Sequence, residues 1–345
     1  MGMITLPASA IEHFKANLDE IFTTGALAEG KWNKAIARGV REYCDCTAAV
    51  PTSANGTGIV ALLEILRVYY RRATVLIQSN TMYGVKTMAA ASGLRLIRVI
   101  DCSAATLMPT ASDVRAAIRE AGAGDDSVIV LSHIGGTVNP DIVEIAEECR
   151  RHDVLLIEDC AHSFGATLNG RHSGTFGLAG VFSFYATKAV PAGEGGTVVT
   201  SDQALGSLVE RYAIYDRFDQ KMNIGVNIRL AEVQALLVYS VIREAEHIIA
   251  SKREIANRYA EVCEKKGIAY VSQDTNGQRG NYYKFIILGN VADFQNIRTR
   301  TSPVYDYALG QSTDVCQSHL CLPIWYGQPI EVTEKVIEEI RSVRV

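Results

Sequence analysis

The chain is predicted to form an α/β fold in which helices cover both faces of a mostly parallel sheet. Three observations predict it: short apolar runs alternate with helical stretches between residues 48 and 157, the runs lack polar alternation, and 345 residues suffice for a large core. Runs that are apolar on both sides are typical of parallel strands buried between helical layers. We therefore expect a three-layer α/β architecture.

The first part of the chain supplies the elements of this sheet in order. A first helix, with apolar residues at helical spacing, ends near Gly25. The expected strands are 48–52, 74–79, 94–100, 127–132 and 154–157. The expected helices between them are 59–70, 83–91, 111–121 and 141–151.

Beyond residue 159 the pattern changes to short strand-like segments near 181–185 and 197–200, separated by glycine-rich turns. A long helical pattern then runs from 230 to about 265, followed by a strand-like segment at 282–288 and a final helix after Thr333. We expect a large α/β domain over residues 1–235. A smaller α+β domain, entered by the long helix, is expected over residues 236–345.

Composition narrows the class of function. With 34 Lys and Arg against 38 Asp and Glu, the chain has a net charge of −4, which predicts neither nucleic-acid nor membrane-surface binding. The eight scattered cysteines and the lack of a signal segment indicate reduced thiols in the cytoplasm. Cys44 and Cys46 have no second pair at zinc-site spacing, so we expect no metal.

A glycine turn follows the first expected strand. Gly56-x-Gly58-x-x-Ala61 opens the next helix, where free amide groups and the helix dipole favour an anion. The same turn fits a dinucleotide site, which would make the protein an NAD-dependent oxidoreductase, but that reading requires an acid about 20 residues later. The next strand ends in Gln78-Ser79-Asn80, so a phosphate monoester is favoured, with a tight turn as the structural alternative.

An acidic group follows the strand that ends at residue 157. Asp159 would be a desolvated carboxylate, which is costly unless it faces a cation or a strong donor. A helix N-cap is the structural alternative. A metal bound by Asp159 and His162 lacks a third ligand at suggestive spacing.

Lys188 lies between an apolar strand and a glycine cluster at 193–196. Burial there would lower its pKa and make the amine nucleophilic, although a lone lysine is usually a surface residue. Together, a phosphate cradle, Asp159 and Lys188 match the needs of pyridoxal 5′-phosphate. The cradle would anchor the phosphate, Asp159 would keep the pyridine nitrogen protonated, and Lys188 would form the Schiff base.

The chain also resembles the DegT/DnrJ/StrS family of pyridoxal-phosphate-dependent sugar aminotransferases, which have the aspartate-aminotransferase-like fold, fold type I. The matching segments are Asn55-Gly56-Thr57, His133-Ile134-Gly135-Gly136, the run from Glu158 to Ala166, Gly174-Thr175-Phe176-Gly177, the run from Ser183 to Lys188, Glu194-Gly195-Gly196, Asn227-x-Arg229 with Gln234-Ala235, and Leu322-Pro323. The block from Glu158 to Gly196 is the most specific part.

The resemblance implies a role for each matching residue. It makes Lys188 the Schiff-base lysine and Asp159 the partner of the pyridine nitrogen. It places His162 beside the 3-hydroxyl of the cofactor. The phosphate-binding positions it implies are Gly56, Thr57 and Ser183.

The resemblance also implies a homodimer with shared sites, because Asn227 matches an asparagine that reaches the phosphate from the neighbouring subunit. It assigns no role to Arg229. Where the family has an aromatic residue stacked on the cofactor ring, this chain has Met82 followed by Tyr83, and either side chain could cover the ring.

The resemblance implies a reaction that moves an amino group from L-glutamate to a keto-sugar, expected to be nucleotide-linked, in amino-sugar biosynthesis. A keto-cyclitol or other non-sugar ketone as acceptor, or a lyase acting on an amino acid, stays open. Relatives with histidine at the lysine position dehydrate sugars, and Lys188 argues against that branch. His133 is expected in the cleft or as a core imidazole, whereas His172 and His319 are expected to face solvent or a substrate loop.

Overall fold

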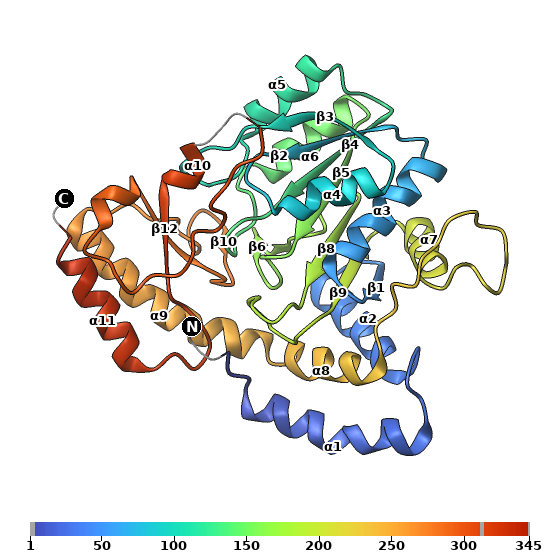
Figure 1. Cartoon of the computed structure of the whole chain (residues 1–345), viewed down its shortest axis with the longest axis horizontal. Helices are drawn as coiled ribbons and strands as arrows, with labels where there is room; N and C mark the ends of the chain where they lie inside the picture. Colours follow the sequence, from blue (N-terminus) through green and yellow to red (C-terminus); the bar gives the residue numbers. More distant parts are fainter. Residues whose placement is uncertain (1–3, 311–313, 344–345) are drawn as a thin grey trace.

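A computed structural model describes residues 4–310 and 314–343 and contains one large sheet at its centre (Figure 1). Its strand order is β1-β9-β8-β5-β4-β2-β3. The strands are β1 (Ala48–Thr52), β2 (Thr74–Gln78), β3 (Arg95–Ile100), β4 (Ser127–Ser132), β5 (Leu155–Cys160), β8 (Ala179–Ser183) and β9 (Gly196–Thr200). Only β9 runs antiparallel to its neighbours, so the expected mostly parallel sheet is confirmed.

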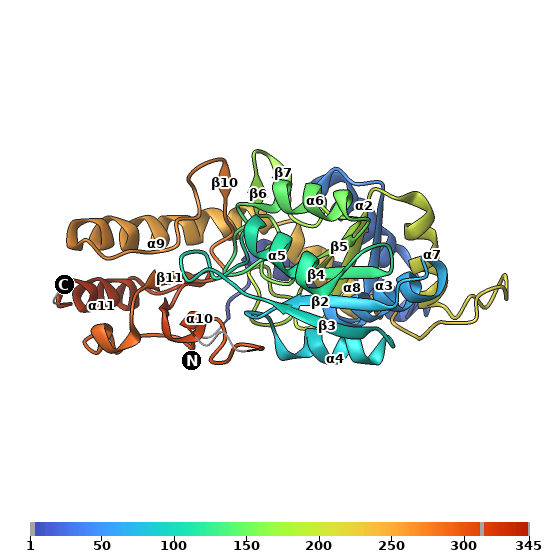
Figure 2. The ribbon, with the colours of Figure 1, turned by 90° about the horizontal axis from the view of Figure 1, so that it is seen from above.

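Helices cover both faces of this sheet (Figure 2). One face packs against α3 (Asn55–Tyr69), α4 (Tyr83–Ala91) and α7 (Gln203–Ala213). The other face packs against α5 (Ala111–Ala121) and α6 (Ile142–Arg151), and further along against α2 (Lys31–Cys44) and α8 (Glu232–Ile242). Strands β2, β4 and β8 are buried along their whole length, which explains why their sequences are continuously apolar.

The N-terminal helix α1 (Ala8–Thr24) ends at Gly25, as expected, with the glycine in the left-handed conformation (φ +68°). Helix α1 packs against α8. Helices α2 and α7 were not predicted. In α2 the buried residues Trp32, Ile36, Val40 and Cys44 recur every four positions, which is the stripe a core-facing helix needs.

The long helical pattern beyond residue 230 forms two helices rather than one. Helix α8 ends at Ile242, and α9 (Ala245–Lys266) begins after a short break at Arg243 and Glu244. The physical reason is a change of partner, because α8 is buried with α1 and α2 whereas the second half of α9 belongs to another core. A break lets each helix present its apolar side to its own core.

That other core lies in the C-terminal part, where β11 (Phe285–Leu288) pairs antiparallel with β12 (His319–Leu322). Helix α9 and α11 (Ile330–Arg341) pack together beside this pair. Shorter elements are β6 (Thr167–Leu168), β7 (Arg171–His172), β10 (Gln278–Arg279), η1 (Val291–Phe294) and α10 (Asp314–Gln317). A domain boundary at residue 235, which falls inside α8, stays a prediction.

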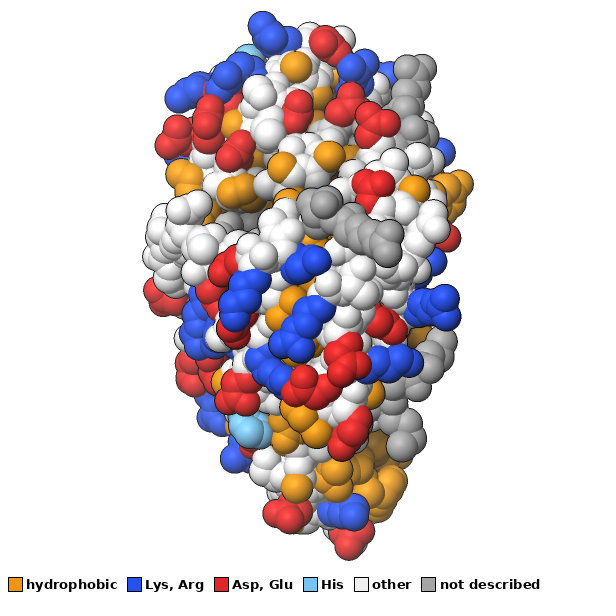
Figure 3. Space-filling view, turned by 90° about the vertical axis from the view of Figure 1, so that its left-hand side faces the viewer, with side chains coloured by type: hydrophobic (Ala, Val, Ile, Leu, Met, Phe, Trp, Pro, Cys, Tyr) orange, Lys and Arg blue, Asp and Glu red, His pale blue; other side chains and the backbone are white. Residues whose placement is uncertain are grey.

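The surface at the C-terminal end carries basic and acidic side chains beside one another (Figure 3). This mixture agrees with the nearly balanced charge of the sequence and differs from the one-signed patch of a nucleic-acid-binding face. Among the described residues, no helix combines the length and apolarity needed to cross a membrane.

Candidate active site

The candidate site lies where the carboxyl ends of β4, β5 and β8 meet the first turn of α3. The parallel register pairs Ser132 with Asp159 and Asp159 with Val181. Groups that follow these strands therefore emerge at one edge of the sheet, where ligands bind in open α/β sheets.

Asp159 is a buried carboxylate whose two oxygens already have protein donors. Its Oδ1 accepts hydrogen bonds from Asn55 Nδ2 and from the amide of Ala161, each at 3.1 Å. Its Oδ2 accepts from Ser132 Oγ at 3.0 Å, and that hydroxyl lies 2.7 Å from Thr81 Oγ1. Three donors fix the orientation of the carboxylate, and they offset its removal from water.

Asn55 connects this carboxylate to the start of α3, a link that sequence reasoning missed. Its Nδ2 also donates to the Val181 carbonyl at 2.8 Å, so one amide group ties together α3, β5 and β8. The motif Asn55-Gly56-Thr57 contains this asparagine, but only the register of the strands shows what its side chain contacts.

The first turn of α3 has the features of an anion site. Its initial amide groups have no intrahelical acceptors, and the helix dipole adds positive potential. The hydroxyl of Thr57 closes the turn by donating to the Ala54 carbonyl at 2.9 Å and accepting from its amide at 3.2 Å. A Cβ at Gly58 would lie 2.8 Å from Val181, so this glycine lets α3 pack closely on β8. A Cβ at Gly56 would lie 2.6 Å from the methyl group of Met88.

Lys188 follows β8 in a compact turn, in which its amide donates to the Tyr185 carbonyl at 2.9 Å. Burial lowers the pKa of the amine to about 8, while Asp159 raises it and Lys284 lowers it further. The amine lies 5.2 Å from the centre of the Tyr283 ring. A large fraction of this amine is therefore neutral near pH 8, as a nucleophile or general base requires.

His162 is buried between two tyrosine rings. Its ring centre lies 4.3 Å from that of Tyr283 and 5.8 Å from that of Tyr305. Burial, assisted by Lys188 and Lys284, lowers its pKa well below the ordinary value, so the imidazole is neutral. Its Nδ1 has no partner among the described residues, whereas Nε2 lies 3.4 Å from the Tyr305 hydroxyl. A ligand hydroxyl would satisfy this buried nitrogen.

Tyr283, Lys284 and Tyr305 reach the site from the C-terminal part and were missed by sequence reasoning. Asn281 attaches that part by donating to the carbonyls of His162 at 2.8 Å and Phe164 at 2.9 Å. This approach requires glycine at position 136 (φ +113°), where a Cβ would lie 2.4 Å from the Asn281 side chain. The paired glycines at 135 and 136 were the only sequence signal.

Met82 and Tyr83 lie at the start of α4 with side chains 39% and 52% exposed. Met82 lies against Gly84, and the Tyr83 ring packs edge-on against Tyr307 at 6.5 Å. Tyr305 is a third candidate for covering a bound ring, since its ring lies beside that of His162 with centres 5.8 Å apart.

The remaining predicted cofactor residues divide by location. Ser183 is buried at the end of β8, where its Oγ lies 3.4 Å from the Tyr185 amide, while the Tyr185 side chain is exposed.

Asn227 is exposed, and its Oδ1 accepts from the Arg229 amide at 3.2 Å. Its side chain thus contacts its own segment rather than Asp159 or Lys188. The Arg229 side chain lies near Glu29 at 3.7 Å.

His133 is a core imidazole. Its Nδ1 accepts from the Asn139 amide at 3.0 Å, so Nε2 donates to Glu158 at 2.7 Å. Glu158 also accepts from the amides of Gly174 and Gly177, at 2.8 and 2.6 Å. With Cys160, these side chains form a compact buried cluster, but their hydrogen bonds are already satisfied within the protein, which indicates a structural role.

The expectation for His319 was wrong, because this residue is fully buried in β12. Its Nδ1 donates to the Val315 carbonyl at 2.7 Å and its Nε2 accepts from the Val304 amide at 3.0 Å. The ring thus satisfies two backbone groups inside the fold. His172 is only half-buried and lies against Tyr43, with ring centres 4.6 Å apart.

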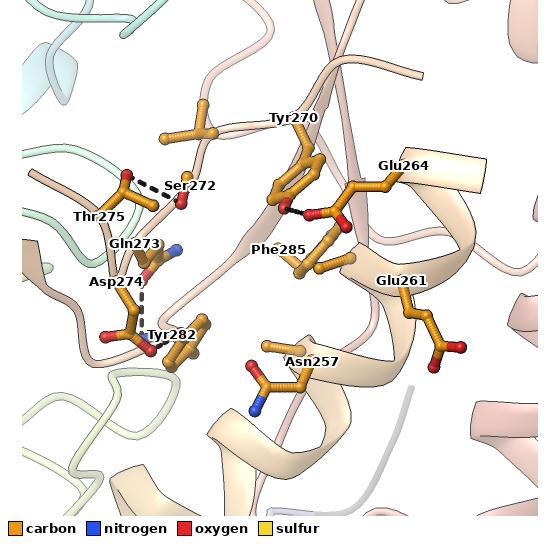
Figure 4. Close-up of a pocket in the computed structure, with 13 residues that line it drawn as sticks. Asn257, Glu261, Glu264, Tyr270, Ser272, Gln273, Asp274, Thr275, Tyr282 and Phe285 are labelled. Carbon is orange, nitrogen blue, oxygen red and sulfur yellow. Dashed lines mark hydrogen bonds between the residues drawn. The ribbon is translucent and has the colours of Figure 1, made fainter. Parts of the chain in front are cut away.

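A separate pocket of about 330 Å³ lies between α9 and residues 270–285 (Figure 4). Its polar groups largely pair with one another, as in the 2.7 Å hydrogen bond from Tyr270 to Glu264. Neither Lys188 nor Asp159 lines it, so this pocket is distinct from the candidate site.

The sequence matches the model of the DegT/DnrJ/EryC1/StrS aminotransferase family over residues 9–341. The chain belongs to this family, and the sequence-based resemblance is confirmed.

Two relatives and one solved structure illustrate the similarity. Protein Rv3402c of Mycobacterium tuberculosis is 30% identical over 264 residues, which cover 71% of this chain and 62% of that protein. The chain thus spans less than two thirds of the length of this curated relative. GDP-perosamine synthase of Escherichia coli O157:H7 is 34% identical over 124 residues, 34% of each chain. The aminotransferase TlmJ from Streptoalloteichus hindustanus superposes with a TM-score of 0.82 and 26% identity, covering 99% of this chain and 98% of TlmJ.

Proposed function

We propose that the protein is a pyridoxal-phosphate-dependent aminotransferase that moves an amino group from L-glutamate to a nucleotide-linked keto-sugar. One observation carries the proposal: the helix α3 N-terminus, Asp159 and Lys188 lie around one edge of the sheet, with Asn55 linking the first two and the charge of Asp159 acting on the Lys188 amine. Membership of an aminotransferase family supports the same reaction class.

The residues present fit pyridoxal phosphate. The first turn of α3, with Gly56 and Thr57, and the nearby Ser183 would hold the phosphate. Asp159 would face the pyridine nitrogen, and the unpartnered Nδ1 of His162 would face the 3-hydroxyl. When bound, the cofactor supplies an electron sink for the carbon that carries the amine.

The role of the protein in the reaction is to hold and move protons. Lys188, with a pKa near 8, can take a proton from the carbon bearing the donor amine and return it on the other side of the transfer. The buried, hydrogen-bonded Asp159 keeps negative charge at a fixed place in the site. Neutral His162 and the tyrosine rings around it exclude water from this side of Lys188.

Product analysis tests the proposal. Glutamate and a ketone should yield 2-oxoglutarate and the corresponding amine in equal amounts. Similarity to a GDP-perosamine synthase supports a nucleotide-linked sugar as acceptor. We expect 2-oxoglutarate to accumulate with a nucleotide-linked keto-sugar and not with a keto-cyclitol or a simple ketone. Accumulation only with a non-sugar ketone would contradict the proposed acceptor, and none with any ketone would contradict the transferase.

We also propose a homodimer in which Asn227 completes the neighbouring site. The segment before Asn227 projects from the molecule (Figure 1) and exposes large apolar side chains, with Phe218 76% exposed. Asp216 anchors this segment, because it pairs with Arg211 at 2.7 Å and accepts from the amides of Lys221 and Met222. An apolar surface on an ordered arm suits a subunit interface.

Mixing two inactive variants tests the shared site. If Lys188 and Asn227 of different subunits form one site, a dimer of Lys188→Ala and Asn227→Ala subunits contains one intact site. Random reassociation of equal amounts should then restore roughly a quarter of the wild-type sites. No recovery in a preparation shown by light scattering to contain mixed dimers would contradict sharing.

A further inference from the structure

Lys252, in the first half of α9, is a buried lysine that the proposed reaction does not use. Its side chain is 3% exposed. Within residues 4–310 and 314–343, no hydrogen bond or ion pair involves its amine, and burial is the one cause of the shift in its pKa. Lysine is almost never this buried without a partner, because removing an ammonium group from water is costly. If the side chain of Lys252 served only to pack its methylene groups, an apolar residue would serve as well and the amine would not be needed.

Lys252 and Lys188 line the same cavity, which has a volume of about 50 Å³. This volume accommodates a group of roughly the size of a carboxylate or a few water molecules. Thr187 and Tyr283 border the cavity beside Lys188, and Tyr326 borders it beside the N-terminal segment. The cavity therefore borders the residue that carries the reactive amine.

The charges around this cavity are unbalanced. Its lining contains two lysines and no acidic residue. The remaining lining is hydroxyl-bearing, aromatic or aliphatic: Ile4, Thr5, Thr187, Ala189, Pro191, Tyr283, Ile324, Trp325 and Tyr326. Burial lowers the pKa of Lys252 to about 7, which is the response of an amine that lacks a counterion. An anionic group in the cavity would supply the missing charge.

We infer that Lys252 forms a carboxylate subsite beside Lys188, which holds one carboxylate of the amino donor and of the oxo-acid made from it. The inference rests on the proposed function, because that reaction brings a dicarboxylic amino acid to Lys188. The ammonium group of Lys252 pairs with the carboxylate, and this charge-assisted contact offsets the burial of both groups. An amino donor without a suitably placed carboxylate would leave the Lys252 ammonium group without an ionic partner.

Succinate, a dicarboxylate that cannot react, is the probe for this subsite. Calorimetry on the cofactor-loaded protein would compare wild type with Lys252→Met, which keeps an unbranched apolar stem and removes the charge. Lys265→Met, on the exposed last turn of the same helix, is the matched control. We expect at least a tenfold loss of succinate affinity in Lys252→Met and none in Lys265→Met. Unchanged affinity in a folded Lys252→Met protein would overturn the inference.

A crystal structure of the wild-type protein with succinate gives a second test that does not depend on a variant. A carboxylate within about 3.2 Å of the Lys252 amine supports the subsite, whereas succinate bound elsewhere overturns it. These outcomes separate the subsite from the proposed function. Failure of glutamate to yield 2-oxoglutarate with any ketone rejects the transferase, while the succinate measurements report on Lys252 alone.

Discussion

The two sides of the candidate site differ in how far the protein satisfies its own polar groups. On the carboxylate side, Asp159 has three donors, which come from β4, from the start of α3 and from the residue that follows β5. On the amine side, Lys188 and Lys252 line a cavity without an acidic residue. The protein itself holds the Asp159 carboxylate in place, whereas the two lysines lack the negative charge that a bound ligand would supply. Substitutions should therefore act differently on the two sides.

The largest effect is expected for Lys188→Ala, which removes the proposed proton-transfer group. Turnover with glutamate should fall by on the order of 10³-fold or more. The melting temperature should not fall, because the lysine is buried with a lowered pKa. Steady-state assays and thermal melts would check both. Retention of more than a tenth of the activity would show that another amine does the chemistry.

The next effect is expected on the carboxylate side. Asp159→Ala leaves the amide of Asn55 and the hydroxyl of Ser132 without their acceptor, besides removing the charge. We expect a loss of turnover of about 10²-fold, together with weaker retention of the cofactor after gel filtration. Equal activity in Asp159→Ala and wild type would mean that the Asp159 carboxylate and its donors play no part in catalysis.

Lys252→Met should stabilise the protein in a pH-dependent way. The folded-state pKa of Lys252, about 7, lies below the unfolded value of 10.5, so the unfolded chain binds more protons between these pH values. Wild-type stability should therefore rise with pH across this window, and the variant should lack this contribution. At pH 7 the variant should be more stable by about 4 kcal/mol, with a difference that shrinks toward pH 10.

Chemical denaturation at pH 7, 8.5 and 10 would measure this difference, with Lys265→Met as control. A constant difference at all three pH values would show that the amine is not the cause.

A smaller effect is expected for Asn55→Ala. This change removes the link from α3 to Asp159 and to Val181 while leaving Ser132 in place. We expect about 1 kcal/mol of lost stability and about a tenfold lower affinity for pyridoxal phosphate. Titration of the cofactor-free variant, followed by absorbance, measures the affinity. Asn80→Ala, which removes a buried bond to the Leu107 carbonyl instead, is a control that should lose stability but not cofactor affinity.

The smallest effect is expected for Tyr305→Phe, since the ring remains and only the hydroxyl near His162 is lost. Cofactor affinity should change by less than about threefold, whereas Tyr305→Ala should lower it by about tenfold if this ring covers the cofactor. An Ala variant that binds the cofactor as wild type does would leave Met82 or Tyr83 as the covering residue.

The placement of Asp159 and Lys188 at one edge of the sheet could be predicted from the local sequence. Asp159 and Lys188 follow apolar strands whose parallel pairing brings their ends together, and period and composition carry that information. Tyr283, Tyr305 and Lys252 come from other elements, and no local pattern indicates which of them faces Lys188. His319 shows the converse error, because its polar neighbours suggested exposure while its two nitrogens satisfy backbone groups inside the fold.

The most direct test of the account locates the lysine that carries the cofactor. The protein would be loaded with pyridoxal phosphate, treated with borohydride to fix the cofactor to its lysine, digested, and analysed by mass spectrometry. We predict that the added mass lies on Lys188 and that Lys188→Ala takes up none. Modification of Lys252 or Lys284 in place of Lys188, at equal stoichiometry, would contradict the assignment on which the proposed function depends.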